Sequence, residues 1–276
     1  MTDLKHGEAR FQAPDGAELF WQHWRPSHPH AVLLNVHGLG DHGGLYPTIA
    51  EWFPPRGVAV YALDTRGNGR SPGRRGHVDR WEVYREDLRR FVRLVHDREG
   101  ILPVLLGHSL GGLMVIDQVL AYPETMGGVA AAAPALGSIG TPAPLLWLAQ
   151  ILSRSWPTFT LQTGLDLSGL ARDPDVVRAV LNDPLFHRYG SARLATEVLN
   201  TIDSVHRRAA TLSRPVLIQH GRDDRMVSID GSRRFARGPA SAMVRLVEYD
   251  AWHALFADTG YEERLVDLTT WMESLE

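Results

Sequence analysis

Short apolar runs alternate with helical patterns along most of the chain. Residues 31–36, 58–63 and 102–106 are almost continuously apolar, as expected of strands buried on both faces of a sheet. Residues 81–98 and 110–122 have the apolar periodicity of helices. Further strands are predicted at residues 19–25, 128–133, 215–219 and 244–249, and further helices at 45–53 and 261–275. Strands joined by crossover helices predict a mostly parallel α/β sheet with helices on both faces.

The alternation stops between about residue 135 and residue 206. In this stretch the pattern is helical, with Pro, Trp and Arg scattered through it, and a strand pattern returns only at 215–219. We therefore predict a first core segment at 1–136, a helical cap at 137–206 and a second core segment at 207–276. In this architecture, an insertion after the sixth strand lies over the carboxyl ends of the strands, where open α/β sheets bind ligands.

Length and composition are those of an ordinary globular protein. The chain has 276 residues and a formal net charge of −3, so nothing indicates a nucleic-acid partner. One locally basic stretch, at residues 70–80, is interpreted as a solvated loop. The chain has no cysteine, which excludes disulfides, thiolate metal sites and cysteine nucleophiles.

No apolar segment near the N-terminus has the pattern of a signal peptide. No run reaches the roughly 18 apolar residues that a membrane-spanning helix needs. We therefore expect a soluble, cytoplasmic protein that is at most peripheral to a membrane. Its oligomeric state is left open.

The clearest chemical motif is GHSLG at residues 107–111. It follows an apolar strand and opens a helix, which is the context of a nucleophile elbow. Such a turn is sharp and strained, and side chains at positions 107 and 111 would collide, so both are glycine. Ser109 would then be exposed at a helix N-terminus, where developing negative charge is favoured. A serine here also argues against dehalogenases and epoxide hydrolases of this architecture, which use an aspartate nucleophile.

A serine nucleophile needs a base and an acid that orients the base. In this topology they follow in the order Ser, Asp or Glu, His. Asp223 and Asp224 lie in the loop after the strand at 215–219, and His253 lies in the loop after the strand at 244–249. These positions predict a catalytic triad, with either aspartate as the acid.

The tetrahedral intermediate also needs hydrogen-bond donors. We expect the backbone N–H of Leu110 and that of Leu39, because Gly38 lets the loop after the strand at 31–36 approach the substrate. His37 and His42 are interpreted as structural, one bracing this loop and the other lying at its rim. A metal site made of these two histidines and Asp41 is disfavoured, and we expect neither a metal nor another cofactor.

Together these motifs resemble the monoacylglycerol lipase and lysophospholipase branch of the α/β-hydrolases. The resemblance covers nearly the whole chain, including LARDPDVVRAVLNDPLFH in the cap. It is carried by HGLGDH, DTRGNGRSPGRRGHV, GHSLGG, HGRDDRMV and WHALFAD. In that family the acid lies three residues after the glycine of G-x-x-D, which here selects Asp224. The resemblance likewise assigns the oxyanion donors to the N–H groups of Leu39 and Leu110, and it implies a mobile cap that binds an acyl chain.

The function expected from these features is ester hydrolysis through an acyl-enzyme. The substrate is expected to be a monoacylglycerol or a similar single-chain lipid ester. Its contacts would include Asp41 and His42 beside the nucleophile and Leu145, Trp147 and Leu148 in the cap. The cap could also touch a membrane or micelle surface transiently. Alternatives are a lysophospholipase, a small-ester esterase or an amidase with the same triad, and a non-catalytic binding protein on this scaffold.

Overall fold

A single eight-stranded sheet organises the molecule. The computed structural model describes residues 4–137, 143–164 and 166–275, without the side chains of 143–146. The strand order is β1-β2-β4-β3-β5-β6-β9-β10; β2 is antiparallel to β1 and β4, and every pairing from β4 to β10 is parallel. These strands are β1 (Lys5–Gln12), β2 (Glu18–Arg25), β3 (Ala31–Val36), β4 (Val58–Leu63), β5 (Val104–His108), β6 (Gly128–Ala132), β9 (Val216–Gly221) and β10 (Val244–Tyr249).

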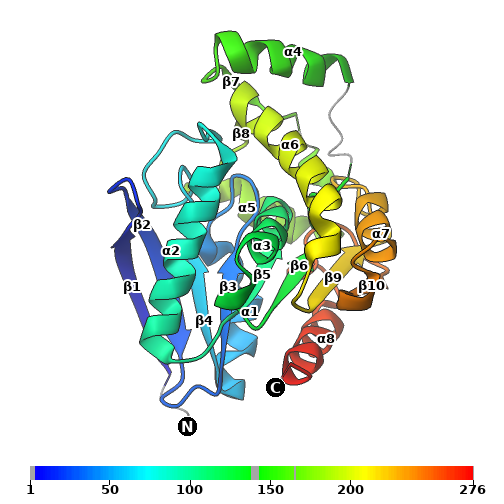
Figure 1. Ribbon diagram of the computed structural model, residues 1–276. Helices are drawn as coiled ribbons and strands as arrows, with labels where there is room; N and C mark the ends of the chain where they lie inside the picture. Colours follow the sequence, from blue (N-terminus) through cyan, green and yellow to red (C-terminus); the bar gives the residue numbers. More distant parts are fainter. Residues whose placement is uncertain (1–3, 138–142, 165, 276) are drawn as a thin grey trace.

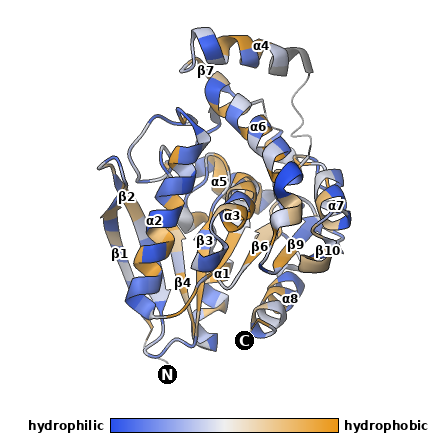
Figure 2. Cartoon of the chain, viewed as in Figure 1, coloured by the Kyte–Doolittle hydropathy of each residue, from blue (hydrophilic) through white to orange (hydrophobic). Residues whose placement is uncertain are grey.

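Helices cover both faces of the sheet, because side chains alternate in direction along each strand. On one face α2 (Trp81–Glu99) and α3 (Leu110–Ala121) pack over Leu34, whereas α8 (Tyr261–Glu273) packs on the other face with Leu33. Figure 1 shows α2 and α3 in front of the sheet, and Figure 2 shows that the central strands and α3 are its most hydrophobic parts. The remaining core helices are α1 (Pro47–Trp52) and α7 (Asp230–Arg237).

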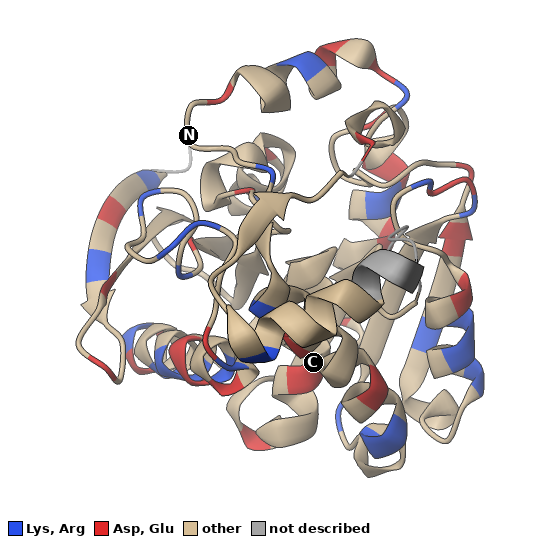
Figure 3. Ribbon diagram, turned by 90° about the horizontal axis from the view of Figure 1, so that it is seen from above, with Lys and Arg blue, Asp and Glu red and all other residues tan. Residues whose placement is uncertain are grey.

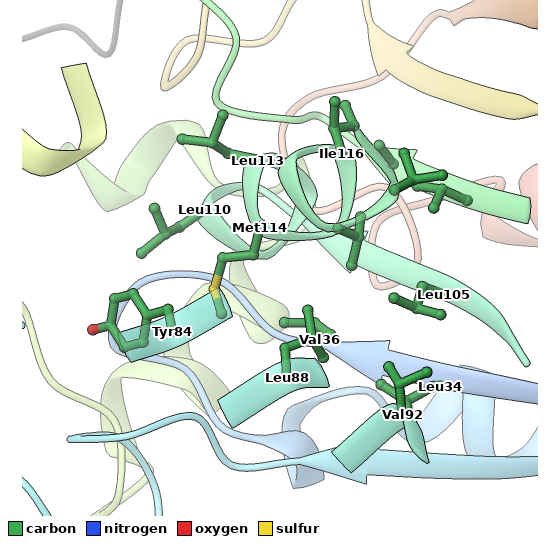
Figure 4. Packing of buried hydrophobic residues seen from close by; sticks show 14 of the residues in the cluster. Leu34, Val36, Tyr84, Leu88, Val92, Leu105, Leu110, Leu113, Met114 and Ile116 are labelled. Atoms are coloured by element: carbon green, nitrogen blue, oxygen red, sulfur yellow. The ribbon is translucent and has the colours of Figure 1, made fainter. Parts of the chain in front are cut away.

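Close packing holds α3 rigidly on the sheet. Figure 4 shows Met114 of α3 lying above Leu88 of α2 and Val36 of β3, with Leu34 and Val92 completing the layer below. All of these side chains are buried. The first turn of α3 is therefore fixed at the carboxyl ends of β3 and β5, which is where the nucleophile motif lies.

Between β6 and β9 the chain leaves the sheet. It forms α4 (Ala143–Ser155), β7 (Thr160–Gln162), α5 (Pro174–Asn182), β8 (Tyr189–Ser191) and α6 (Ala192–Arg208). Strands β7 and β8 pair with each other, so the insertion is not wholly helical as the sequence pattern suggested. Figure 1 shows α4 at the top of the molecule, resting on α6.

Two other expectations need correction. Strand β1 was not predicted; most of it is exposed at the edge of the sheet, so its apolar pattern is weak. The basic stretch at 70–80 is only partly solvated. Arg75 donates to the backbone carbonyls of Gly67 and Gly69, and the neighbouring Gly76 accepts from Ser191 at the start of α6. This loop therefore helps to support the insertion.

A buried aspartate joins three helices. Asp117 of α3 accepts hydrogen bonds from Arg85 of α2 (2.7 Å), Arg208 at the end of α6 (2.8 Å) and the Trp81 indole (2.9 Å). Asp117→Ala is expected to lower the free energy of unfolding by about 3 kcal/mol in urea denaturation, because Arg85 and Arg208, both partly buried, lose the buried carboxylate that they share. Glu82→Ala, which removes an exposed partner of the same Arg85, should cost under about 0.5 kcal/mol. Equal effects of the two changes would contradict this role of Asp117.

Candidate active site

Ser109 occupies a strained turn between β5 and α3. Its backbone angles are φ 54° and ψ −116°, in a region that side chains other than glycine rarely adopt. Two backbone hydrogen bonds hold Ser109 in this conformation: its N–H donates to the carbonyl of Ala132 (2.9 Å), and its carbonyl accepts the N–H of Ala135 (3.0 Å). A non-glycine residue kept in this conformation by surrounding hydrogen bonds is typical of a functional site.

The two glycines of the motif are required sterically. A Cβ atom at Gly107 would lie 2.2 Å from the carbonyl oxygen of Gly111, and one at Gly111 would lie 2.2 Å from that of Val36. Both neighbours are backbone atoms and cannot turn aside. The sharp turn that presents Ser109 therefore depends on both glycines.

His253 and Asp224 form a short hydrogen bond. His253 Nδ1 lies 2.7 Å from Asp224 Oδ2, and both side chains are buried. The other carboxylate oxygen accepts the backbone N–H groups of Met226 (2.8 Å) and Val227 (2.9 Å). Asp223 instead faces solvent and pairs with Arg172 on the surface. Of the two neighbouring aspartates, only Asp224 contacts the histidine.

The electrostatics keep this pair in the forms that a base and its acid need. Burial alone would raise the pKa of Asp224, but hydrogen bonds from His220 and His253 hold it well below its usual range. Burial lowers the pKa of His253, and its contact with Asp224 only partly offsets this. The imidazole is therefore neutral, and able to accept a proton, at neutral pH.

Ser109 and His253 line the same two cavities, but no direct hydrogen bond between their side chains is present among the described residues. Nucleophile–base contacts are often loose in ligand-free enzymes and tighten when substrate binds. The hydrogen bond between Asp224 and His253 is thus preformed, whereas the one between Ser109 and His253 is expected to form when substrate binds.

The loop after β3 lies beside the nucleophile. A Cβ atom at Gly38 would be 3.3 Å from the Cβ of Ser109, so only a glycine fits there without displacing its neighbours. Leu39 lines both cavities next to Ser109, and Leu110 begins α3 directly after it. The backbone of this loop and the N-terminus of α3 thus flank Ser109 as an oxyanion hole requires.

The polar residues of this loop point in different directions. His37 is buried, accepts the N–H of Thr65 (2.9 Å) and bonds the Gly38 carbonyl (2.7 Å), so it braces the loop. His42 does not lie at the rim: it is buried, and its Nε2 bonds Asp183 of the insertion at 3.1 Å. In the part of the chain that the structure describes, neither these residues nor any others form a cluster able to hold a metal.

A network that the sequence did not reveal surrounds the base. The Tyr46 hydroxyl donates to Asp41 (2.8 Å), accepts the N–H of Gly38 (3.2 Å) and lies 3.0 Å from His108 Nδ1. His108 Nε2 bonds the backbone carbonyl of His253 at 3.2 Å. The network thus ties the loop after β3 to the base. His108 is one of the two unspecified positions of G-x-S-x-G and Tyr46 lies in an ordinary helical pattern, so only the fold shows their connection.

Two cavities of different character meet at Ser109. The larger, of about 180 Å³, extends under α4 and along α6. Its described lining is mostly apolar, including Leu152, Phe159 and Val198, and its only ionisable residue is His253. The smaller, of about 40 Å³, is lined in part by Asp41 and Arg188. The site therefore presents a large apolar chamber and, next to it, a smaller one whose mostly apolar lining also includes charged groups.

Only some of the predicted substrate contacts line the cavities at Ser109. Leu148 lines the larger cavity and Asp41 the smaller, whereas Trp147 is 66% exposed and lines neither. His42 also lines neither cavity, because its ring is turned to Asp183. The side chain of Leu145 lies outside the described residues. Part of the apolar lining comes from α6, with Leu194, Ala195 and Val198, which the sequence did not single out.

Comparison with known proteins identifies relatives of the whole chain. Residues 27–260 match the family described as "Serine aminopeptidase, S33". The monoacylglycerol lipase of Mycolicibacterium smegmatis is 32% identical over 280 residues, 99% of each chain. Phospholipase YtpA of Bacillus subtilis is 29% identical, over 87% of this chain and 94% of its own. The crystal structure of Paleococcus ferrophilus monoacylglycerol lipase has a TM-score of 0.83 at 32% identity, covering 99% of this chain and 100% of that one.

The family match spans most of the chain, and a relative above 30% identity aligns along almost its full length. The mostly parallel sheet also agrees with the TM-score of 0.83 to a solved structure of that kind. This chain therefore belongs to the S33 family of α/β-hydrolases, in the branch that contains the monoacylglycerol lipases.

Proposed function

We propose that this protein is a serine carboxylic-ester hydrolase that acts on monoacylglycerols or similar single-chain lipid esters. The observation that carries the proposal is the apolar cavity of about 180 Å³ that begins at Ser109. Such a chamber suits an acyl chain, because each buried methylene contributes about 0.8 kcal/mol. The relatives named monoacylglycerol lipases support the same substrate class.

In the proposed mechanism, Ser109 attacks the ester carbonyl while His253 takes its proton. Asp224 holds the imidazole with Nδ1–H toward itself, so that Nε2 is the free base, and stabilises the imidazolium that forms. The N–H groups of Leu39 and Leu110 receive the oxyanion. His253 then protonates the leaving alcohol and activates the water that hydrolyses the acyl-enzyme. No cofactor enters any step.

The two cavities suggest how the ester is oriented. The acyl chain would occupy the larger cavity, and the alcohol would face the smaller one, where Asp41 can accept a hydrogen bond from a hydroxyl group. Burial alone would raise the pKa of Asp41, but the nearby His108 ring and the Tyr46 hydroxyl lower it, so the carboxylate stays ionised as an acceptor.

We further propose that residues 137–206 act as a cap that meets a lipid surface. Trp147, Ile151 and Trp156 are 66%, 44% and 58% exposed on or just after α4. Figure 3, which views the molecule from above, shows α4 almost without charge, and Arg154 is the single charged residue in its sequence. An apolar, tryptophan-bearing helix beside an acyl cavity is suited to lie at a membrane or micelle interface. Within the described residues, no helix has the length and hydrophobicity to cross a bilayer.

Acyl-chain length provides the test of this function. For esters of one alcohol, kcat/KM is expected to rise roughly fourfold per added methylene until the cavity is filled. Ala195→Phe, which should fill part of the larger cavity, is expected to lower activity on dodecanoate but not on acetate. A steady fall from acetate to dodecanoate in the wild type would contradict a lipid substrate.

One observation favours a second substrate class, the lysophospholipids. Arg188 lines the smaller cavity, where an alcohol carrying a phosphate would place its negative charge. The similarity to a protein named phospholipase points the same way. A monoacylglycerol and a lysophosphatidylcholine with the same acyl chain separate the two, because only the second should lose activity in Arg188→Gln.

A further inference from the structure

A second histidine contacts the carboxylate of Asp224. His220, near the end of β9, is completely buried, and its Nε2 lies 3.2 Å from Asp224 Oδ2. This is the same oxygen that bonds His253 Nδ1. His220 Nε2 is also 3.2 Å from the backbone carbonyl of Val227. Asp224 therefore lies between two imidazole rings, and the mechanism above uses only one of them.

The proton positions on His220 follow from its neighbours. The two atoms that face Nε2 are a carboxylate oxygen and a carbonyl oxygen, which only accept hydrogen bonds, so Nε2 carries the proton. On the other side of the ring, Nδ1 lies 2.8 Å from the hydroxyl of Ser232. In the neutral ring Nδ1 is an acceptor, and the hydroxyl donates to it. Ser232 thus selects the tautomer that donates to Asp224.

We propose that His220, whose tautomer is fixed by Ser232, is a positioning residue that keeps the Asp224 carboxylate oriented toward His253. The inference rests on the proposed triad. It extends the hydrogen-bond chain to Ser232, His220, Asp224 and His253. His220 does not touch the substrate, and it acts only through the acid.

Local packing explains how Ser232 reaches the ring. Ser232 lies in the first turn of α7 and is fully buried. The residue before it, Gly231, lies so close to the loop after β6 that a Cβ atom there would be 2.3 Å from the N atom of Gly137. This contact sets the N-terminal end of α7 against the core. The hydroxyl is therefore placed by the backbone rather than by a flexible side chain.

Two effects follow from the geometry. The His220 bond restrains rotation of the carboxylate, and it shares the negative charge that would otherwise be directed wholly at His253. Without it, Asp224 would attract the proton on His253 more strongly and raise the pKa of that imidazole. His108, whose ring centre is 4.7 Å from that of His253, remains in place and opposes this rise. Removal of His220 should therefore lower kcat and move the acidic limb of the pH profile upward.

The test compares His220→Leu with His220→Gln on a soluble short-chain ester across a range of pH. Leucine removes the donor, whereas the glutamine amide nitrogen can occupy the place of Nε2. His220→Leu is expected to lower kcat roughly 10- to 100-fold with little change in KM, the scale of one lost hydrogen bond to a charged group. Its acidic limb should shift to higher pH. His220→Gln should recover most of kcat and the wild-type pH profile.

Ser232→Ala serves if His220→Leu does not fold. It should lower kcat several-fold, because the ring loses the donor that fixes its tautomer. The matched control is Ser71→Ala, which removes another buried hydroxyl, one that bonds the backbone of Phe20 and Asp64 away from both cavities. That variant should lose thermal stability only and keep the pH profile.

Proton NMR adds a readout that a purely structural role would not change. The downfield resonance of the His253–Asp224 hydrogen bond should move in His220→Leu and be restored in His220→Gln. The inference is overturned if His220→Leu folds with wild-type kcat and pH profile, or if leucine and glutamine behave alike. The proposed triad fails by a different result, namely activity that persists in Ser109→Ala.

Discussion

Ser109→Ala is expected to abolish ester hydrolysis, with a fall in kcat of roughly 10⁶-fold. The alanine keeps the fold, because the turn is held by the backbone contacts of residue 109 and not by its hydroxyl. A fluorophosphonate probe should label the wild-type protein at this residue and leave the variant unlabelled. Heat-denatured wild type provides the control, since labelling requires the assembled site.

Two results would count against this role. Labelling that persists in Ser109→Ala would place the nucleophile elsewhere. Unchanged ester hydrolysis by a correctly folded Ser109→Ala variant would exclude an acyl-enzyme formed on Ser109. A wild-type protein that binds lipid esters without turnover would instead support the non-catalytic alternative. The strained backbone at Ser109 is a cost that a mere binding protein has no reason to keep.

Asp224→Asn should be nearly inactive although folded, with kcat reduced roughly 10⁴-fold. The carboxylate accepts hydrogen bonds from His253, His220 and two backbone N–H groups. An amide places an NH₂ group where one of these donors points, which favours the wrong imidazole tautomer. The measurement is kcat for one ester, with circular dichroism to establish that the variant is folded.

Asp223→Asn is the matched control, because the two residues are adjacent in one loop. Asp223 is 59% exposed and pairs with Arg172 at 3.0 Å, a surface ion pair worth about 1 kcal/mol or less. Its variant should retain most of the wild-type kcat. The reverse pattern, with Asp223→Asn inactive and Asp224→Asn active, would assign the acid to Asp223.

The buried strands were the easiest part of the fold to predict. Residues 31–36 and 58–63 coincide with β3 and β4 because their sequences are almost continuously apolar. Strand β1 was missed because one of its sides is left open at the sheet edge. The pairing of β7 with β8 was missed because three-residue strands carry too little pattern to be recognised.

The site was predictable where chemistry constrains the local sequence. The strained turn at Ser109 needs a glycine on each side, so the GHSLG motif can be recognised from five consecutive residues. Tyr46, His108 and His220 are different, because each acts through a partner distant in the sequence or through a buried geometry. The direction of His42 is set by Asp183, more than a hundred positions away. No local pattern records such a contact.

The junction of β6 and β9 has a thermodynamic consequence. These neighbouring strands pair in register, with Val129 opposite Val216, although the whole insertion separates them in the sequence. The entropy lost on closing a flexible loop grows only logarithmically with its length, by about 0.6 kcal/mol for each doubling. The entropic cost of closing the chain between β6 and β9 should therefore change little when the inserted segment is longer or shorter, provided that the helix replacing α6 still fills the core with side chains such as Val198 and Ile202. The junction between β6 and β9 can therefore accept different inserted segments, so that acyl specificity can change while the catalytic residues stay in place.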